Sequence, residues 1–496
     1  MDTNPFTERR NGLTLVELLV AMVVTMLLVA SLAEVFAYFS TTISANRATI
    51  EMSGQLRGAT SRLQPDLEGI TVPVRPWPQA DSGLGYFEYF EGPSRDYDSA
   101  RADLSFGDVD DIIMFTSRSN REPFLGRIYA SLNNSEASFS SNVAEIIWWT
   151  SLDDKNGNGT WESDQGERFQ LHRRTLLIRP DLNNDNGYLL VTSDPIATFQ
   201  NENDLSVHAD TILDTSVDPP VRRRVLVANS LADLTIRKNR FAHVSVLHNP
   251  PSRRQGFPHR IDNVYFPAGS PPVIGLLKSA YAQHDNTLRG VYHVGEDVVL
   301  ANVLSFDVKA YDPNVPVRRL PTGTAALLPS DPGYYMAGVT QIGQGGYVDL
   351  NYNSAMNSYF SDPPNRRSQL FIPSAGGFRP LATYDTWSFD YEHDGINQDG
   401  PVTTPDSLRV PPNRVDPSTG TIDEGTDGFD TPAPVLRGSP PTWQLISYNG
   451  IDDVGERETS PPYPVPLRGI QIRVRIIDPD SRQVRQMTVV SDFTPE

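Results

Sequence analysis

The chain has 496 residues and a mass of 55.0 kDa, with 61 acidic and 42 basic residues that give a net charge of −19. An acidic chain is poorly suited to neutralising phosphates, so we expect no nucleic-acid partner. Cysteine is absent, which excludes disulfides, thiolate nucleophiles and cysteine-based metal centres. The 35 glycines and 41 prolines indicate a turn-rich, mainly β protein.

Residues 13–39 form the only long apolar stretch of the sequence. At a rise of about 1.5 Å per residue, a helix of this length spans a hydrocarbon core about 30 Å thick. A short polar leader, residues 1–12, precedes this stretch and carries Arg9 and Arg10 beside it. Because positive charges favour the cytoplasmic side, we expect the leader to stay there and the rest of the chain to be translocated.

A carboxylate, Glu17, lies near the start of this apolar stretch. Such a charge costs about 2.5–3.5 kcal/mol on insertion scales, so it requires a partner or a function. Residues 12–20, GLTLVELLV, resemble the cleavage and methylation signal of type IV pilins and type II secretion pseudopilins. The resemblance implies that a prepilin peptidase cuts after Gly12 and that Leu13, in place of the usual phenylalanine, becomes a methylated N-terminus. It also implies that Glu17 pairs with the N-terminal amine of a neighbouring pilin or pseudopilin subunit.

Two other interpretations of the N-terminus are a cleaved secretory signal peptide, with Ser31-Leu32-Ala33 as its cleavage site, and a plain membrane anchor. Glu17 in the apolar core is awkward for the secretory signal. The next segment, residues 40–70, also argues against it, because its apolar residues recur at helical spacing: Ala45, Ala48, Met52, Leu56, Ala59 and Leu63. We therefore expect one helix with a membrane-spanning half at 13–39 and an amphipathic half at 40–70. Pro65 should kink or end it.

Residues 71–496 are expected to form an extracytoplasmic, mainly antiparallel β head, so the fold class is α+β. Strands are predicted at 112–116, 144–150, 169–179, 188–192, 224–228, 234–236 and 298–311. The final pair is the clearest, because apolar residues alternate from Ile470 to Ile476 and a turn leads to a returning strand at 484–490. Loop-rich insertions are predicted at 249–272, 312–334 and 400–441. This order resembles J-type minor pseudopilins and large minor pilins, although the head is much larger than theirs.

Local signals of catalysis are weak in this sequence. The glycines at 343–346 lack phosphate-loop spacing, the eight histidines are scattered, and nothing local marks a catalytic triad. Arginine runs such as 222–224 are better explained as solvated strand faces or partners of carboxylates. We expect no enzymatic activity.

Two acidic loops have the composition of calcium sites. In the first, Asp154, Asn156 and Asn158 take alternate places, a glycine follows, and Thr160 and Glu162 offer further oxygens. In the second, the candidate ligands are Asp390, Glu392 and Asp394, and a third, weaker cluster spans 423–430. The same residue types form bare turns, so Ca²⁺ binding and a simple turn remain alternatives.

Together these observations predict a minor pilin or pseudopilin subunit of a type IV pilus-like or type II secretion filament. The expected location is the bacterial inner membrane, with a single pass, and then the filament. The expected partners are prepilin peptidase and other pilin-type subunits. The main alternative is a membrane-anchored surface binding protein or adhesin that uses a prepilin-type export signal. A hydrolase on a pilin-like anchor is a third possibility without a localised site.

Overall fold

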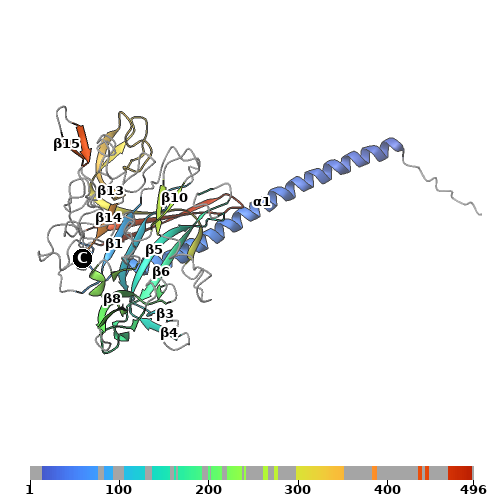
Figure 1. The fold of residues 1–496 in the computed structure, drawn as a ribbon. Coiled ribbons are helices and arrows are strands. Elements are labelled where there is room, and N and C mark those ends of the chain that lie inside the picture. Colours follow the sequence, from blue (N-terminus) through green and yellow to red (C-terminus); the bar gives the residue numbers. More distant parts are fainter. Residues whose placement is uncertain are drawn as a thin grey trace, which may run out of the picture.

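A computed structural model gives the fold of the chain (Figure 1). It describes residues 14–75, 83–92, 106–128, 137–156, 161–162, 166–192, 199–200, 203–214, 220–236, 239–241, 261–265, 273–277, 298–350, 382–387, 434–437, 442–445 and 467–493. Structural statements below concern these residues.

One long helix, α1 (Leu15–Glu68), begins the fold. Thr14 is its N-cap and forms a capping box with Glu17, and Gly69 is its C-cap. Pro65 lies inside the last turn, and the helix continues for three more residues, so the proline itself does not end it. Its missing N–H removes only one bond there, and its carbonyl accepts a bond from the Gly69 amide at 3.1 Å.

The head is built on a nine-stranded sheet in the order β14-β1-β2-β5-β6-β12-β17-β18, with β13 paired to β12. All of its pairings are antiparallel. The strands are β1 (Phe87–Glu91), β2 (Ile112–Arg118), β5 (Val143–Leu152), β6 (Phe169–Leu177), β12 (Val298–Arg319), β13 (Thr340–Val348), β14 (Ala382–Asp385), β17 (Gly469–Ile477) and β18 (Val484–Asp492). The long helix and the mainly antiparallel β head confirm the predicted α+β class.

Smaller elements surround this sheet (Figure 1). A three-stranded sheet has the order β7-β9-β8, and three hairpins pair β3 with β4, β10 with β11 and β15 with β16. Their bounds are β3 (Phe124–Ile128), β4 (Ala137–Ser141), β7 (Leu190–Val191), β8 (Val207–Asp214), β9 (Val221–Ala228), β10 (Ile261–Tyr265), β11 (Val273–Leu277), β15 (Pro434–Arg437) and β16 (Thr442–Leu445). Two short 3-10 turns, η3 (Pro180–Leu182) and η4 (Asp233–Thr235), connect strands.

The main core lies between the C-terminal half of α1 and one face of the large sheet. The predicted helical stripe is confirmed, because Ala48, Met52, Leu56, Ala59 and Leu63 are buried and Ala45 is half-buried. The alternation predicted in the last hairpin is also confirmed: the apolar residues of β17 are buried in the same cluster, and their polar neighbours are half-buried.

A second apolar cluster covers the opposite face of β1, β2, β5 and β6. Leu234 and Phe241 supply part of this cover from the segment around η4. Strands buried on both faces have continuous apolar runs instead of alternation, which explains the sequences IIMF in β2 and EIIWW in β5.

Two sequence predictions about the head differ from the structure. Residues 234–236 were expected to form a strand, but 233–235 form η4, a turn in which Asp233 accepts bonds from the backbone and hydroxyl of Ser230. Residues 312–334 were expected to form a loop, but β12 continues to Arg319 because β13 pairs with it there. The expected insertions at 249–272 and 400–441 lie outside the described residues, except for β10 within the first and β15 within the second.

An ion pair between the half-buried Arg173 and the buried Asp66 holds the end of α1 against the sheet. Arg173 donates through Nε to Asp66 Oδ2 and through Nη2 to Asp66 Oδ1, both at 2.7 Å. Trp148 donates through Nε1 to the same carboxylate at 3.0 Å. Because Trp148 and Arg173 are directly opposite each other on β5 and β6, one cross-strand pair presents both donors to the helix. The bidentate geometry therefore fixes the position of the last helical turn.

The first prediction concerns this ion pair. Arg173→Met should destabilise the head by about 3 kcal/mol, because it leaves the Asp66 carboxylate buried without its cation. The double variant Asp66→Asn with Arg173→Met should recover part of this loss. As a surface control, Arg179→Met removes the exposed pair with Asp181 and should cost less than about 1 kcal/mol. Urea unfolding in detergent measures all three; a double variant no more stable than Arg173→Met would contradict the account.

His172 is a buried titratable group in the middle of β6. Its ring stacks on Trp149 with a centroid distance of 5.0 Å, and its Nε2 lies 2.8 Å from Ser151 Oγ. Burial lowers the pKa of His172 to about 4, because the charged imidazolium loses its hydration. The unfolded chain therefore takes up a proton at a higher pH than the folded chain does.

The second prediction follows from this difference in pKa. The contribution of His172 to stability is complete above its unfolded pKa of about 6.5. It should fall as the pH drops from there towards about 4, by about 1.4 kcal/mol per pH unit, because protonation favours the unfolded state. The difference in unfolding free energy between the wild type and His172→Gln should therefore change across this pH range. A difference that stays constant with pH would contradict a buried neutral His172.

Candidate functional site

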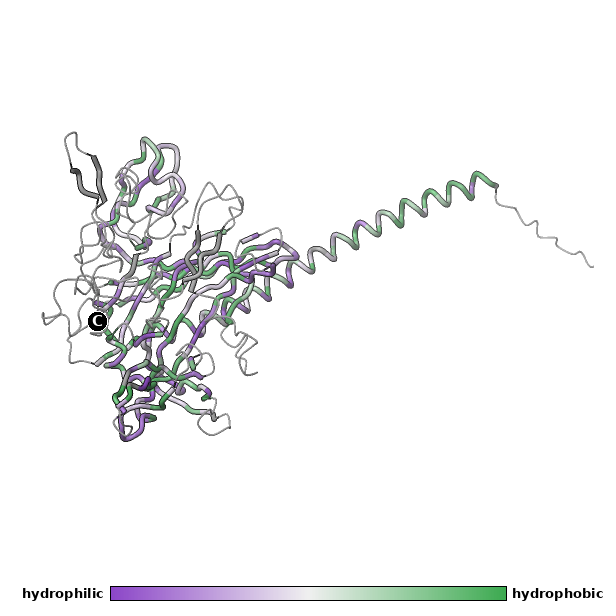
Figure 2. Tube along the Cα trace, viewed as in Figure 1, coloured by the Kyte–Doolittle hydropathy of each residue, from purple (hydrophilic) through white to green (hydrophobic). Residues whose placement is uncertain are grey.

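The N-terminal half of α1 is exposed and contacts nothing in the head. In the part of the chain that the structure describes, α1 is the one helix long and apolar enough to cross a membrane, and an 18-residue stretch of it has a mean hydropathy of 2.6. Figure 2 shows this half extending away from the head as a largely hydrophobic rod. Its large apolar side chains from Leu15 to Phe39 are 48–82% exposed. Such a surface needs lipid or other helices to cover it.

Glu17 lies in the first turn of this exposed rod, and its carboxylate turns back towards the N-cap. Glu17 Oε2 accepts bonds from the Thr14 backbone amide at 3.0 Å and from Thr14 Oγ1 at 2.9 Å. The Glu17 amide donates to Thr14 Oγ1 at 3.2 Å. Gly12 and Leu13 lie outside the described residues. The Glu17 carboxylate is thus bound to Thr14, the residue that follows the expected new N-terminus, Leu13.

The same periodicity that buries one face of α1 leaves the opposite face exposed beyond the apolar rod. Ile43 and Ile50 are 65% and 74% exposed, and Gly54 and Gly58 follow on this face, where a Cβ atom at either glycine would meet no atom within 4 Å. The head therefore covers only one side of the amphipathic half, and the exposed apolar surface continues from the rod alongside the head.

The first candidate calcium loop is described only in part, because Asn158 and Thr160 lie outside the described residues. Asn156 Nδ2 donates to Glu162 Oε2 at 2.8 Å. The buried Glu167 carboxylate accepts bonds from the backbone amides of Glu162, at 2.8 Å, and Lys155, at 3.3 Å. Calcium binding here stays a prediction, which thermal unfolding with calcium and with chelator tests. The second loop, with Asp390, Glu392 and Asp394, lies outside the described residues.

The structure also brings together a carboxylate cluster that the sequence did not predict. Glu91, Asp108 and Asp111 are buried, and one oxygen of each lies within 4.8 Å of the others. Asp111 accepts a bond from the Val308 amide at 2.7 Å. Burial, together with the negative charges of Glu91 and Asp108, raises the pKa of Asp111 well above its usual range. Burial and repulsion therefore favour the protonated form of Asp111, and we assign no ion to the cluster.

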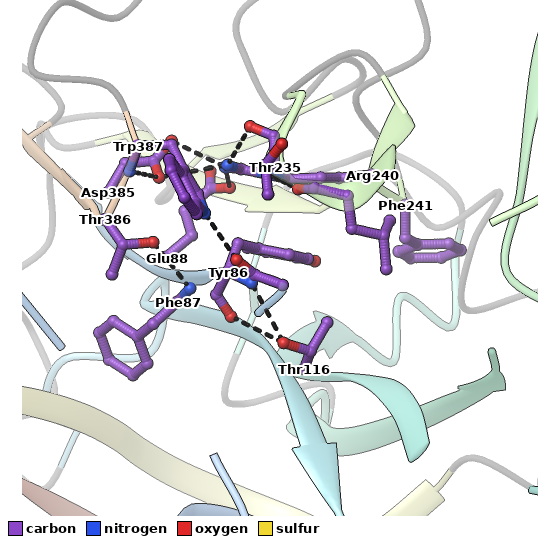
Figure 3. Close-up of polar contacts among 12 residues, drawn as sticks. Tyr86, Phe87, Glu88, Thr116, Thr235, Arg240, Phe241, Asp385, Thr386 and Trp387 are labelled. Atoms are coloured by element: carbon purple, nitrogen blue, oxygen red, sulfur yellow. Dashed lines mark hydrogen bonds and ion pairs between the residues drawn. The ribbon is translucent and has the colours of Figure 1, made fainter. Parts of the chain in front are cut away.

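A second buried cluster centres on Arg240 (Figure 3). Its Nη1 donates to the carboxylates of Glu88, at 3.0 Å, and Asp385, at 2.7 Å. Its Nε donates to the Leu234 carbonyl at 3.0 Å. Its guanidinium carbon lies 4.2 Å from the centre of the Tyr86 ring. These contacts join β1, β14 and the segment after η4. Sequence reasoning missed Arg240 because its acidic partners are more than 140 residues away.

The contact between Ser151 and His172 in the described head does not form a catalytic triad. The Ser151–His172 pair lacks an orienting carboxylate, because His172 Nδ1 has no hydrogen-bond partner in the described part of the chain. The pair is also buried between strands, where it has no access to a substrate.

Comparison with known proteins gives a match at the N-terminus. Residues 8–33 match the prokaryotic N-terminal methylation motif, which includes Gly12, Leu13 and Glu17. No curated protein and no solved structure matches the chain. The chain therefore carries a prepilin-type N-terminal signal on an exposed apolar helix.

Proposed function

We propose that this chain is a minor pilin or pseudopilin subunit of a type IV pilus-like or type II secretion filament. The observation that carries the proposal is the methylation motif at residues 8–33 on a helix that the rest of the chain leaves uncovered. Lipid covers this surface before assembly, and the helices of other subunits cover it afterwards. The activity is assembly, and the partners are prepilin peptidase and other pilin-type chains.

Glu17 has a specific task in this proposal. In the capping box its carboxylate is satisfied by Thr14 of the same chain, which lowers the cost of a charge in the membrane. Cleavage of the prepilin-type signal in neighbouring subunits creates positively charged N-terminal amines there. Exchange of the Thr14 donors, which are neutral, for such an amine converts the contact into an ion pair and favours docking in one register.

The size of the head supports a low-copy position, such as the filament tip. The nine-stranded sheet and its surrounding hairpins extend sideways from the end of α1 (Figure 1). Because closely spaced helices would force many such heads to overlap, we propose that only a few copies enter one filament.

The alternative is an anchored adhesin that uses the same export signal without assembly. Both proteins would be processed and would hold the helix in the membrane. Purification of the detergent-extracted chain separates them, because co-purifying pilin-type proteins support assembly and their absence supports the adhesin.

The third prediction concerns processing. The mature chain should start at methylated Leu13, and Gly12→Leu should block cleavage because the peptidase must fit a small residue before the cut. Intact-mass measurement of the purified chain distinguishes the possibilities. A chain that begins at Glu34, or one that retains Met1 in the wild type, would overturn the proposed processing.

The fourth prediction separates membrane insertion from assembly. Glu17→Ala should insert into the membrane at least as well as the wild type, because a costly charge is gone. Its incorporation into filaments should fall, because the neighbouring amine loses its counter-charge. Glu17→Gln is the matched control for shape, and it should fail similarly if the charge is what matters. Wild-type incorporation of both variants would count against the assigned role.

A further inference from the structure

Lysine is rare in this protein, with four lysines beside 38 arginines. One of the four, Lys309, is buried in the middle of β12. Its ammonium nitrogen lies 2.6 Å from Asp349 Oδ1 and 2.9 Å from Asp307 Oδ1. All three side chains are at most 5% exposed.

The strand register sets this geometry. Ala310 is opposite Val348 in the antiparallel pair of β12 and β13, so Lys309 lies beside Asp349, the first residue after β13. Val308 and Ala310 flank the lysine, Val348 and Leu350 flank the aspartate, and all four are buried. The amine nitrogen and the carboxyl group are thus held in contact in a site that is almost closed to bulk water.

Lysine at position 309 is notable because the head also contains a buried arginine between two carboxylates. Arg240 is also buried and also joins two carboxylates, Glu88 and Asp385. Arginine suits buried ion pairs because its planar group stays charged and makes several bonds. A lysine amine can lose its proton when buried and then acts as a nucleophile. Position 309 therefore carries the residue that can react.

Further acids lie beside this contact. The backbone N–H of Val308 donates a hydrogen bond to the Asp111 carboxylate. The backbone N–H of Leu350 donates one to the Glu91 carboxylate at 3.1 Å. Both acids thus accept from backbone amides next to Lys309 and Asp349, and Arg473 Nη1 lies 3.6 Å from Asp307 Oδ2. Burial and the neighbouring negative charges raise the pKa of Asp111 well above its usual range, which favours the protonated form of a carboxyl group beside this contact.

We propose that Lys309 Nζ and the Asp349 side-chain carboxyl condense to an intramolecular amide, which cross-links β12 to the end of β13. Proton transfer within the ion pair gives a neutral amine and a carboxylic acid. Nζ then attacks Cγ of Asp349, a C–N bond forms, and the C–OH bond breaks. Asp307 accepts a proton from Nζ and returns it to the departing hydroxyl, which leaves as water. No oxidant, reductant or other reactant is required.

The cross-link would fasten the base of the β12–β13 arm, which includes residues 310–348 between the joined side chains. The chain contains no cysteine, so disulfides cannot supply such a bond. This inference concerns the head alone and does not depend on the proposed role in a filament.

Mass spectrometry of the full-length protein, purified in detergent, tests the proposal. After correction for the N-terminus, the intact mass should be lower than the sequence mass by one water molecule. Proteolysis should release one branched peptide that contains Lys309 and Asp349, with no cleavage after Lys309 by trypsin. A wild-type chain at full mass, with both residues in unmodified linear peptides, would overturn the proposal.

Three variants sharpen the test. Lys309→Arg keeps the positive charge but should show the full mass, and Asp307→Asn should slow the mass loss. Asp349→Asn should lose one ammonia molecule instead of water, because the same amide then forms with a different leaving group. Water loss that persists in Lys309→Arg would place the dehydration elsewhere and would also overturn the proposal.

Discussion

The contact among Asp66, Arg173 and Trp148 determines how the rest of the molecule is arranged. It joins the last turn of α1 to the cross-strand pair at the centre of β5 and β6, and thereby sets the direction in which the helix leaves the head. A carboxylate at a helix C-terminus opposes the helix dipole, so Asp66 needs the cation that Arg173 supplies. Once this turn is fixed, one stripe of α1 packs on the sheet, and the exposed rod projects beyond it (Figure 2).

Much of this arrangement could be predicted from sequence because it follows from the local spacing of apolar residues. The apolar run, the helical stripe from Ala48 to Leu63 and the alternation in β17 each report which face is covered. Boundaries were less predictable where pairing decided them, as in the extension of β12 to Arg319 by β13. Residues around Leu234 are apolar because they cover the second face of the sheet. The prediction of a strand at 234–236 was wrong, because a short apolar run does not distinguish a strand from such a covering turn.

The buried charges could not be predicted, because their partners are distant in sequence. Arg240 finds Glu88 and Asp385, Arg173 finds Asp66, and Lys309 finds Asp349 only after the sheet has formed. Each of these pairs ties separate segments together, at a cost in desolvation that good geometry must offset. Of the predicted site residues, Glu17 has a defined local partner, and the rest of the processing site lies outside the described residues.

The central claim is that helices of other pilin-type subunits cover the exposed face of α1. Photo-cross-linking in cells tests it directly, with a photoreactive residue placed at Ile50 on this face or at Leu125 on β3, which are 74% and 77% exposed. The account predicts that position 50 captures proteins with methylated prepilin-type N-termini and that the equally exposed position 125 does not. Capture of no such protein at position 50, in cells that assemble the filament, would contradict it.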